Sequence, residues 1–287
     1  MQRSLLPRNS ANKAFLGSQE GRLDSSPCIG GVNQQQIEDD MLLSGKTAVL
    51  SGAGNVEGIG FATAKAFVEA GARVLLVDIN EAELAGAAER LGDAAVYVCA
   101  DVRSEDSVRT VFDRVRSEFG RLDILLNNAG ITQPRKTVDI TRDDYDAIMD
   151  VNLRGTLIMT QQALPLMAAG ASIICIASIA AQRGGGLMGG PHYAASKGGV
   201  ASLVKAIARD VSPAGIRINS VNPGVIMSKM TRDFYTDEIT AKVLPTIPMG
   251  RFGEPSDVAS ACVFLASDLS SYITGSAIDV NGGMHMN

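Results

Sequence analysis

Short runs that are apolar at almost every position alternate with longer amphipathic stretches from residue 46 to the C-terminus. The clear runs span residues 47–50, 73–77, 95–99, 122–126 and 172–176, and two weaker runs span 217–221 and 277–280. A run with no polar alternation suits a strand that is covered on both faces, as in a parallel sheet. The pattern therefore predicts about seven parallel strands.

The stretches between these runs predict helices. The clearest helix begins near Ser104, whose hydroxyl can cap free backbone amides, while Glu105 and Asp106 favour the positive end of the helix. One face of it is apolar, at Val108, Val111, Phe112, Val115 and Phe119. Strands that alternate with helices imply right-handed crossovers. We therefore expect an α/β fold, a doubly wound parallel sheet with helices on both faces, as a single domain over residues 42–287.

Residues 1–41 show neither helical nor strand periodicity and are rich in Ser, Asn, Gln and Gly. Such a composition predicts a disordered or flexible tail. Arg3, Arg8 and Lys13 weakly resemble an organelle transit peptide, although the acidic run at 38–40 does not fit one.

Composition excludes several classes of function. The net charge of −5 gives no basic footprint for nucleic acid, and no apolar run approaches the ~20 residues that span a bilayer. The 4 cysteines are scattered, which predicts free thiols in a reducing compartment, the cytoplasm. With only His192 and His285 available, a His-based metal site or a Ser-His-Asp triad is not expected.

A glycine-rich turn follows the first predicted strand and opens an Ala-rich helix. Its residues include Gly52, Gly54, Gly58, Ile59 and Gly60. Glycines let the backbone approach a pyrophosphate, and the start of a helix offers free N–H groups to it. A strand before the turn and a helix after it are the context that makes this motif informative. The turn predicts a dinucleotide site.

Asp78 ends the second predicted strand, where a carboxylate can bind both ribose hydroxyls of the adenosine half. It repels a 2′-phosphate by ~1 kcal/mol at 4 Å in water and by ~4 kcal/mol at an effective dielectric of 20. Glu57 adds to this bias, and no Arg or Lys follows Asp78 closely. The predicted cofactor is NAD rather than NADP, unless Asp78 only caps the next turn.

Tyr193 and Lys197 lie four residues apart, which places both side chains on one face of a helix. A phenol has a pKa near ~10, and lowering it by ~3 units requires about 4 kcal/mol of preferential interaction with the anion. A fixed ammonium favours the phenolate, and a second cation is needed to complete the shift. An oxidised nicotinamide is such a cation, although an ordinary pair on a helix surface has the same spacing.

These motifs together resemble the short-chain dehydrogenase/reductase family, with its Rossmann fold, over roughly residues 42–286. The resemblance implies that Asn128, Ala129 and Gly130 lie against the adenine ribose and that Asp101 and Val102 contact the adenine. It also implies a clasp for the nicotinamide amide, made by Pro223, Gly224, Ile226 and Ser228. The family more often has Thr where this chain has Ser228. A homotetramer is implied as well, and apolar Val200, Leu203, Val204 and Ile207 suit either a subunit contact or the protomer core.

The resemblance assigns the catalytic set to Asn152, Ser178, Tyr193 and Lys197. Tyr193 is the acid–base, Ser178 hydrogen-bonds the substrate oxygen, and Lys197 lowers the pKa of Tyr193 and holds the nicotinamide ribose. Asn152 would anchor a water that links Lys197 to solvent. Taken singly, Asn152 can also be a helix cap and Ser178 an ordinary hydroxyl at a strand end.

The chain departs from the family pattern at two places. Counted from Gly52 the glycine turn is two residues longer than usual, and counted from Gly54 its spacing is regular, which leaves open which glycine contacts the pyrophosphate. The interval between Ser178 and Tyr193 is also wider than usual and holds a glycine-rich segment, 184–190. We expect that segment to shape the substrate wall without displacing Ser178.

The segment 225–250 is expected to cover the substrate, as it does in the family. Its larger apolar side chains are Met227, Met230, Phe234, Tyr235 and Met249. They suit a secondary alcohol or ketone with a sizeable carbon skeleton, while Lys229, Arg232 and Arg183 either meet an anionic substrate or are solvated. The ending 273–284 is similar to that of 3-oxoacyl-[acyl-carrier-protein] reductases, most of which use NADPH, in conflict with Asp78.

The sequence therefore predicts an NAD-dependent oxidoreductase that acts on the CH–OH group of a small-molecule alcohol. A reductase of the 3-oxoacyl type is one alternative. A non-catalytic NAD-binding regulator would keep the dinucleotide residues without needing the proton-transfer set. Epimerase chemistry on a nucleotide sugar usually needs a larger C-terminal substrate domain than this chain has.

Overall fold

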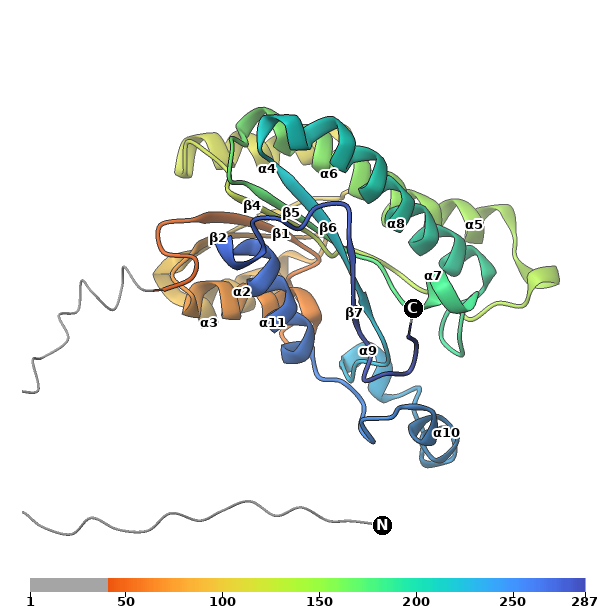
Figure 1. Ribbon diagram of the computed structural model, residues 1–287. Helices are drawn as coiled ribbons and strands as arrows, with labels where there is room; N and C mark the ends of the chain where they lie inside the picture. The colour runs from red at the N-terminus through yellow and green to blue at the C-terminus, as the bar shows by residue number, and fades with distance from the viewer. Residues whose placement is uncertain (1–40, 287) are drawn as a thin grey trace, which may run out of the picture.

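The computed structural model describes residues 41–286 of the chain (Figure 1). The predicted tail, 1–41, lies outside the described residues except at its last position. One sheet of seven parallel strands forms the centre, in the order β3-β2-β1-β4-β5-β6-β7. The strands are β1 (Thr47–Ser51), β2 (Arg73–Asp78), β3 (Ala95–Cys99), β4 (Ile124–Asn127), β5 (Ser172–Ile176), β6 (Arg217–Pro223) and β7 (Ala277–Val280). All seven predicted runs are strands, and the predicted doubly wound Rossmann fold is confirmed.

Helices cover both faces of the sheet (Figure 1). The first layer consists of α2 (Ile59–Glu69), α3 (Glu81–Leu91) and α11 (Pro255–Ala266). The opposite layer consists of α4 (Glu105–Glu118), α6 (Gly155–Ala163) and α8 (Pro191–Val211), with α5 (Arg142–Met149) beyond it. Shorter helices are α7 (Ala180–Arg183), α9 (Lys229–Arg232) and α10 (Asp237–Val243). The remaining turns are 3-10 helices at Gly92–Ala94, Thr137–Asp139, Leu164–Leu166, Ser212–Ala214, Leu244–Thr246 and Asp268–Ser270, and a π-helix, η3 (Asp150–Arg154).

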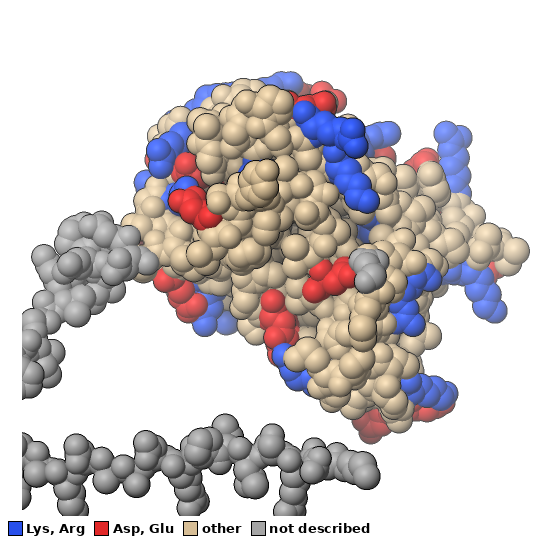
Figure 2. All heavy atoms as spheres, in the orientation of Figure 1, with Lys and Arg blue, Asp and Glu red and all other residues tan. Residues whose placement is uncertain are grey.

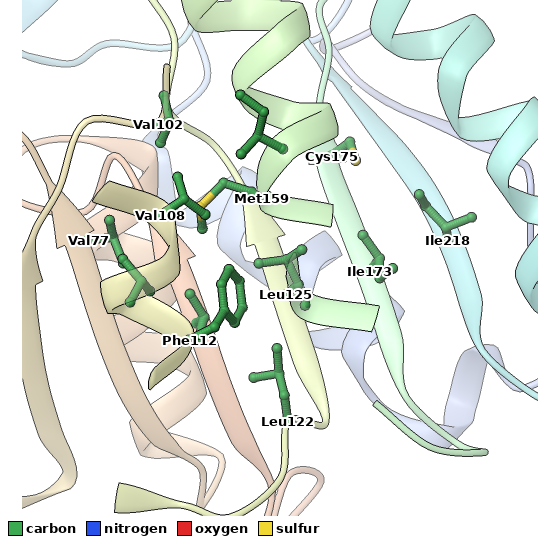
Figure 3. Packing of buried hydrophobic residues seen from close by; sticks show 14 of the residues in the cluster. Val77, Val102, Val108, Phe112, Leu122, Leu125, Met159, Ile173, Cys175 and Ile218 are labelled. Carbon is green, nitrogen blue, oxygen red and sulfur yellow. The ribbon is translucent and has the colours of Figure 1, made fainter. Parts of the chain in front are cut away.

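Consecutive residues of a strand enter different cores, which explains why the runs carry no polar alternation. Val49 packs with α4, α6 and α8, whereas its neighbour Leu50 packs with α2 and α11. Figure 3 shows the first core, where Phe112 and Met159 lie over Val77 and Leu125 of the sheet. Both faces of each strand therefore need apolar side chains.

Helix α4 forms as its sequence predicts. The Ser104 hydroxyl accepts a hydrogen bond from the Ser107 amide at 3.2 Å, and Val108, Val111, Phe112 and Val115 are buried. Phe119 lies under Arg73, whose guanidinium carbon is 4.9 Å from the ring centroid. On α8, Val200 and Val204 belong to the protomer core, and Leu203 and Ile207 are half-buried.

The order of strands reverses between β1 and β4. Crossovers from β1 lead outward to β2 and β3, and the later strands build the sheet in the other direction. In such sheets a crevice opens at the carboxyl ends of the two strands at the reversal. The sequence segments that follow β1 and β4 carry the predicted glycine turn and Asn128.

Candidate active site

Three cavities that share wall residues open at the carboxyl ends of the strands. The first is a cleft of about 310 Å³. The predicted site residues that line it are Gly52, Gly58, Ile59, Asp78, Asn128, Gly130, Ser178, Tyr193, Lys197, Pro223, Gly224, Ile226 and Ser228. A second cavity of about 320 Å³ adds Asp101, Val102 and Ala129. A third, of about 530 Å³, shares Ser178 and Tyr193 with the cleft. Of the predicted site residues, Gly54, Gly60 and Asn152 do not line these cavities.

The glycine turn is built by close backbone packing. Gly52 has a φ of +66°, and a Cβ there would lie 2.8 Å from the Ala129 Cα. A Cβ at Gly60 would collide with the carbonyl of Gly52. These two glycines therefore set the shape of the turn and the approach of α2 to it.

The amides of the turn identify where an anion can bind. Gly54 donates its N–H to Asp78 Oδ2 at 3.0 Å, and Gly58 donates its N–H to the Asn55 carbonyl at 2.9 Å. Gly58 immediately precedes α2, and no side chain caps that helix. The first amides of a helix have no partner within it, and the Ala62 amide already bonds to the Gly58 carbonyl, so the free donors of α2 are the amides of residues 59–61, beginning at the cleft with Ile59.

Asn128 and Ser51 join the ends of β1 and β4. The Asn128 side chain donates to the carbonyls of Ser51 and Gly52 at 3.1 and 2.8 Å. The Ser51 hydroxyl accepts from the amides of Asn128 and Ala129 at 3.0 and 3.1 Å. Sequence reasoning missed Ser51, although its position at the end of a strand beside the turn was a usable signal.

Asp78 is fixed in place by backbone amides. Its Oδ1 accepts from Ile79 at 2.8 Å and from Asn80 at 3.3 Å, and its Oδ2 accepts from Gly54. These bonds hold a carboxylate at the wall of both the cleft and the second cavity.

Arg103 is the cation that sequence reasoning missed. It lines the second cavity together with Asp78. Its Nε lies 3.0 Å from each carboxylate oxygen of Asp101, and its second terminal nitrogen lies 2.6 Å from Oδ2. The Arg103 guanidinium holds the pKa of Asp101 below its ordinary value. The charge of Arg103 is thus already matched beside the adenosine end of the site.

Asn152 is fully buried in the π-helix η3, between α5 and α6. Its Oδ1 accepts from the Ile131 amide at 2.8 Å, and its Nδ2 donates to the Ile131 carbonyl and to Ser196 Oγ, each at 3.0 Å. A Cβ at Gly130 would lie 3.3 Å from both Asn152 Oδ1 and Lys197 Nζ. A π-turn inside a helix often marks a functional site, and this one places Asn152 behind Gly130 and Ile131, which line the cleft.

Tyr193 and Ser178 lie together in the wall of the cleft, where the Ser178 hydroxyl can hydrogen-bond the phenol. Tyr193 lies in the first turn of α8, and Ser178 follows β5 and also accepts from the Ala180 amide at 3.1 Å. Burial raises the pKa of Tyr193, and the hydrogen bond from Ser178 partly offsets that rise. The protein groups alone therefore favour the neutral phenol.

Lys197 is buried, and its Nζ donates to the Ile176 carbonyl at 2.7 Å. Burial lowers the pKa of Lys197 to about 8. Burial is the largest influence on the pKa of both Tyr193 and Lys197, so the lowering of the Tyr193 pKa by this ammonium stays a prediction. Because burial disfavours both the phenolate of Tyr193 and the ammonium of Lys197, a second cation must stabilise the phenolate by more than the sequence alone indicated.

Comparison with known proteins identifies the family. The model of the family described as enoyl-(acyl carrier protein) reductase matches residues 52–285. An uncharacterized short-chain type dehydrogenase/reductase of Sinorhizobium fredii is 49% identical over 250 residues, which cover 85% of this chain and 99% of that protein. This chain belongs to the short-chain dehydrogenase/reductase family.

Other family members show how broad that relationship is. The 3-oxoacyl-[acyl-carrier-protein] reductase FabG of Thermotoga maritima is 38% identical, with 85% of this chain and 99% of that protein covered. A crystal structure described as a short-chain dehydrogenase/reductase, glucose/ribitol dehydrogenase, from Brucella melitensis superposes with a TM-score of 0.79 at 33% identity. That likeness covers 86% of this chain and 99% of the other. Oxidoreductase activity of the family type follows for this chain.

The glycine-rich segment 184–190 forms one wall of the third cavity. Gly189 packs on the ring of Tyr193 so closely that a Cβ there would clash with ring carbon Cδ1. Thr132, from the loop after β4, donates its hydroxyl to the Met188 carbonyl at 2.7 Å and ties the segment down. The additional residues between Ser178 and Tyr193 thus cover the tyrosine ring, a role the sequence did not reveal.

The segment 225–250 contributes less apolar surface than its sequence suggested. Tyr235 lines the third cavity and contacts Phe252, with ring centroids 5.1 Å apart. Met249, in contrast, is 66% exposed and does not line that cavity. Thr231 accepts the Ser228 amide at 2.7 Å and donates to the Ile226 carbonyl at 2.7 Å, which fixes the chain beside the cleft.

Basic and acidic side chains are interspersed among uncharged ones on the face shown in Figure 2. This face therefore presents no continuous basic surface for a large polyanion. None of the described helices combines the length and the apolarity needed to cross a membrane.

Proposed function

We propose that this chain transfers a hydride between NAD(H) and a secondary alcohol or ketone, with Tyr193 as the acid–base. The observation that carries the proposal is a shared wall, since Ser178 and Tyr193 line both the 310 Å³ cleft and the 530 Å³ cavity. Groups in such a wall can contact a dinucleotide and a substrate at once, as hydride transfer requires.

Two features of the cleft support a dinucleotide. The free amides of the first turn of α2, beginning with Ile59, suit the pyrophosphate, and Asp78 suits the adenosine ribose. The remaining cofactor residues are assigned by family resemblance and are Gly52, Gly54, Gly58, Gly60, Asp101, Val102, Asn128, Ala129, Gly130, Pro223, Gly224, Ile226 and Ser228. When bound, an oxidised nicotinamide accepts the hydride and adds a positive charge beside the active site.

In the oxidation direction, the phenolate of Tyr193 accepts the hydroxyl proton of the substrate as the hydride leaves the same carbon. Ser178 hydrogen-bonds the substrate oxygen as its charge changes. Lys197 supplies a cation behind Tyr193, and Asn152 holds the Ile131 backbone and Ser196 so that the floor beneath Lys197 stays in place. In reduction, Tyr193 returns the proton.

The preference for NAD over NADP rests on Asp78. Its carboxylate repels a 2′-phosphate, and Arg103 in the same cavity is engaged by Asp101 rather than available to such a phosphate. Relatives named as 3-oxoacyl-[acyl-carrier-protein] reductases support reduction of a 3-oxoacyl group as the second candidate. A non-catalytic regulator is disfavoured because Ser178, Tyr193 and Lys197 line one cleft.

The proposal also covers the oligomeric state and the cellular compartment of the enzyme. We expect residues 42–287 to act as one catalytic domain in a homotetramer in the cytoplasm, as the family resemblance and the scattered cysteines suggest. Size-exclusion chromatography with light scattering tests the oligomeric state directly.

The test of the function is a panel of secondary alcohols and ketones assayed at 340 nm with each nicotinamide cofactor. Absorbance at 340 nm is expected to change with NAD(H). The value of kcat/KM with NADP(H) is expected to be at least about 10-fold lower than with NAD(H). This factor follows from the repulsion between Asp78 and a 2′-phosphate, which is at most ~4 kcal/mol and is reduced by salt screening. Turnover only with NADPH and a 3-oxoacyl thioester would replace the first candidate by the second.

A further inference from the structure

We propose that Arg183 binds an anionic group of the substrate, so that the enzyme prefers an alcohol or ketone that carries a carboxylate or a phosphate. The inference rests on the proposed function and adds a substrate class to it. It starts from the charges in the wall of the 530 Å³ cavity.

Those charges have one sign. Arg183 and Lys242 line the cavity, and no Asp or Glu is among its lining residues. Much of the remaining wall is apolar, with Leu187, Val225 and Val243. A cavity with cationic and apolar walls suits an organic anion with a carbon skeleton better than it suits a neutral polyol.

The two cations differ in how their charges are matched. Lys242 lies 2.6 Å from Glu238 on α10, so its charge is compensated. Within residues 41–286, the Arg183 guanidinium has no ion pair and no hydrogen bond. An unpaired guanidinium in the wall of a substrate cavity offers a planar fork of donors to a carboxylate or phosphate.

The other cations that the sequence raised as anion binders are engaged elsewhere. Lys229 lies 3.8 Å from Glu83, and Arg232 lies 3.2 Å from Glu57. Neither residue lines the 530 Å³ cavity. Of the three, Arg183 is therefore the one placed to meet a substrate.

The backbone fixes Arg183 relative to the reacting groups. Helix α7 begins two residues after Ser178, and the Arg183 amide donates to the Ile179 carbonyl at 2.9 Å. Gly184 then ends the helix with a φ of +80°. The four residues of α7 advance about 4.5 Å along its axis from Ala180 to Arg183, so the anion belongs a few bonds away from the carbon that Ser178 and Tyr193 flank.

Two sources can supply such an anion. One is a free hydroxy acid or oxo acid, whose carboxylate lies on the reacting molecule itself. The other is an acyl thioester whose carrier arm ends in a phosphate. Both present oxygen atoms that accept from a guanidinium, so matched substrates must separate them.

The experiment measures kcat and KM for matched pairs in wild type, Arg183→Gln and Arg183→Lys, using the full chain with NAD(H). One pair is a 3-hydroxy acid and its methyl ester, and the other is a 3-oxoacyl thioester with and without a terminal phosphate. In Arg183→Gln, KM for the anionic member is expected to rise about 10- to 100-fold, the range for a lost hydrogen bond to a charged group. KM for the neutral member and kcat for both are expected to change less than about 3-fold, with partial recovery in Arg183→Lys.

Arg109→Gln is the matched control. It also removes one positive charge, but from an exposed side chain of α4 that is paired with Asp106. It is expected to leave both KM values unchanged. If Arg183→Gln raises KM only for the 3-hydroxy acid of the first pair, the natural substrate is a free acid. If it raises KM only for the phosphorylated thioester of the second pair, the anion is on a carrier arm.

Equal effects of Arg183→Gln on charged and neutral members would overturn the inference while leaving the proposed function intact. A wild type that prefers the neutral members would do the same. Failure of wild type to turn over any member with either nicotinamide cofactor would instead overturn the proposed function itself.

Discussion

Gly189 packs directly against the ring of Tyr193. A Cβ at this position would clash with a ring carbon close to the tyrosine backbone, so either the ring or the segment 184–190 must move. Gly189→Ala is expected to lower kcat about 10- to 100-fold with little change in the KM for NAD, because a small misplacement of a reacting group is costly.

Gly186→Ala is the control for that change, since Gly186 lies in the same segment and nothing lies within 4 Å of the Cβ position. Its kinetics are expected to match wild type. If Gly189→Ala also retains wild-type kcat, the packing of the segment on Tyr193 has no role in catalysis.

Lys197 gives a stability prediction with a defined sign. Its pKa is about 8 in the folded protein and about 10.4 in an unfolded chain, so between these values the unfolded state binds more protons. The free energy of unfolding therefore rises with pH in that window, because the destabilising burial of the ammonium is progressively relieved.

The comparison that isolates this effect is wild type against Lys197→Met, by chemical denaturation from pH 7 to pH 9.5. Wild type is expected to gain about 2 kcal/mol relative to the variant over that range. Cys262, whose pKa burial raises to about 12, is common to both proteins and cancels in the difference. Cys175 interacts with the charge of Lys197, so both proteins are compared in a Cys175→Ala background. Parallel curves would mean that Lys197 has no depressed pKa.

Among the elements, those whose local pattern and tertiary environment agree were predictable from sequence. Strands β1, β2, β4 and β5 are covered on both faces, so their runs are almost entirely apolar, and the cap and apolar face of α4 lie where the sequence places them. The strand β4 begins at Ile124 rather than 122, since the Leu122 amide bonds to Leu166 instead of to a neighbouring strand.

Other features depend on contacts that no local pattern encodes. The π-helix η3 inserts one residue into a helical register without a sequence signal, and it is what brings Asn152 under Ile131. The place of Arg103 in the same cavity as Asp78 depended on the adjacent ends of β2 and β3. The sequence could not show which residue of the turn contacts the pyrophosphate, because that depends on which amides are already hydrogen-bonded within the protein, as those of Gly54 and Gly58 are.

The cap of α4 provides a test at this scale. Ser104→Ala removes the acceptor for the Ser107 amide and is expected to lower the free energy of unfolding by about 1 kcal/mol, with kcat/KM unchanged. Ser117→Ala, near the exposed C-terminal end of the same helix, is the control and is expected to be neutral. A loss of activity in Ser104→Ala would show that α4 is coupled to the active site.

At the scale of the whole molecule, the reversal of strand order creates a crevice that loops after β1, β2, β4, β5 and β6 all border. A cofactor bound there bridges many elements and should stabilise the fold as a unit. At 100 times its Kd, NAD is expected to add about 2.7 kcal/mol, which corresponds to a rise in Tm of about 5–10 °C for a chain of this size.

The same thermal measurement with NADP tests the cofactor assignment. NADP at the same concentration is expected to raise Tm by less than NAD does, and Asp78→Ala is expected to narrow that difference, because the repelling carboxylate is gone. Equal shifts with both dinucleotides in wild type would remove Asp78 as the determinant of cofactor choice.

The central claim, that the phenol of Tyr193 carries the proton in a hydride transfer, is tested most directly by Tyr193→Phe. This variant keeps the ring against Gly189 and removes only the hydroxyl. With the best substrate of the panel, its kcat is expected to fall by at least about 10²-fold while the Kd for NAD, from fluorescence titration, stays within a few fold of wild type. Turnover near the wild-type rate, with cofactor binding intact, would contradict the account.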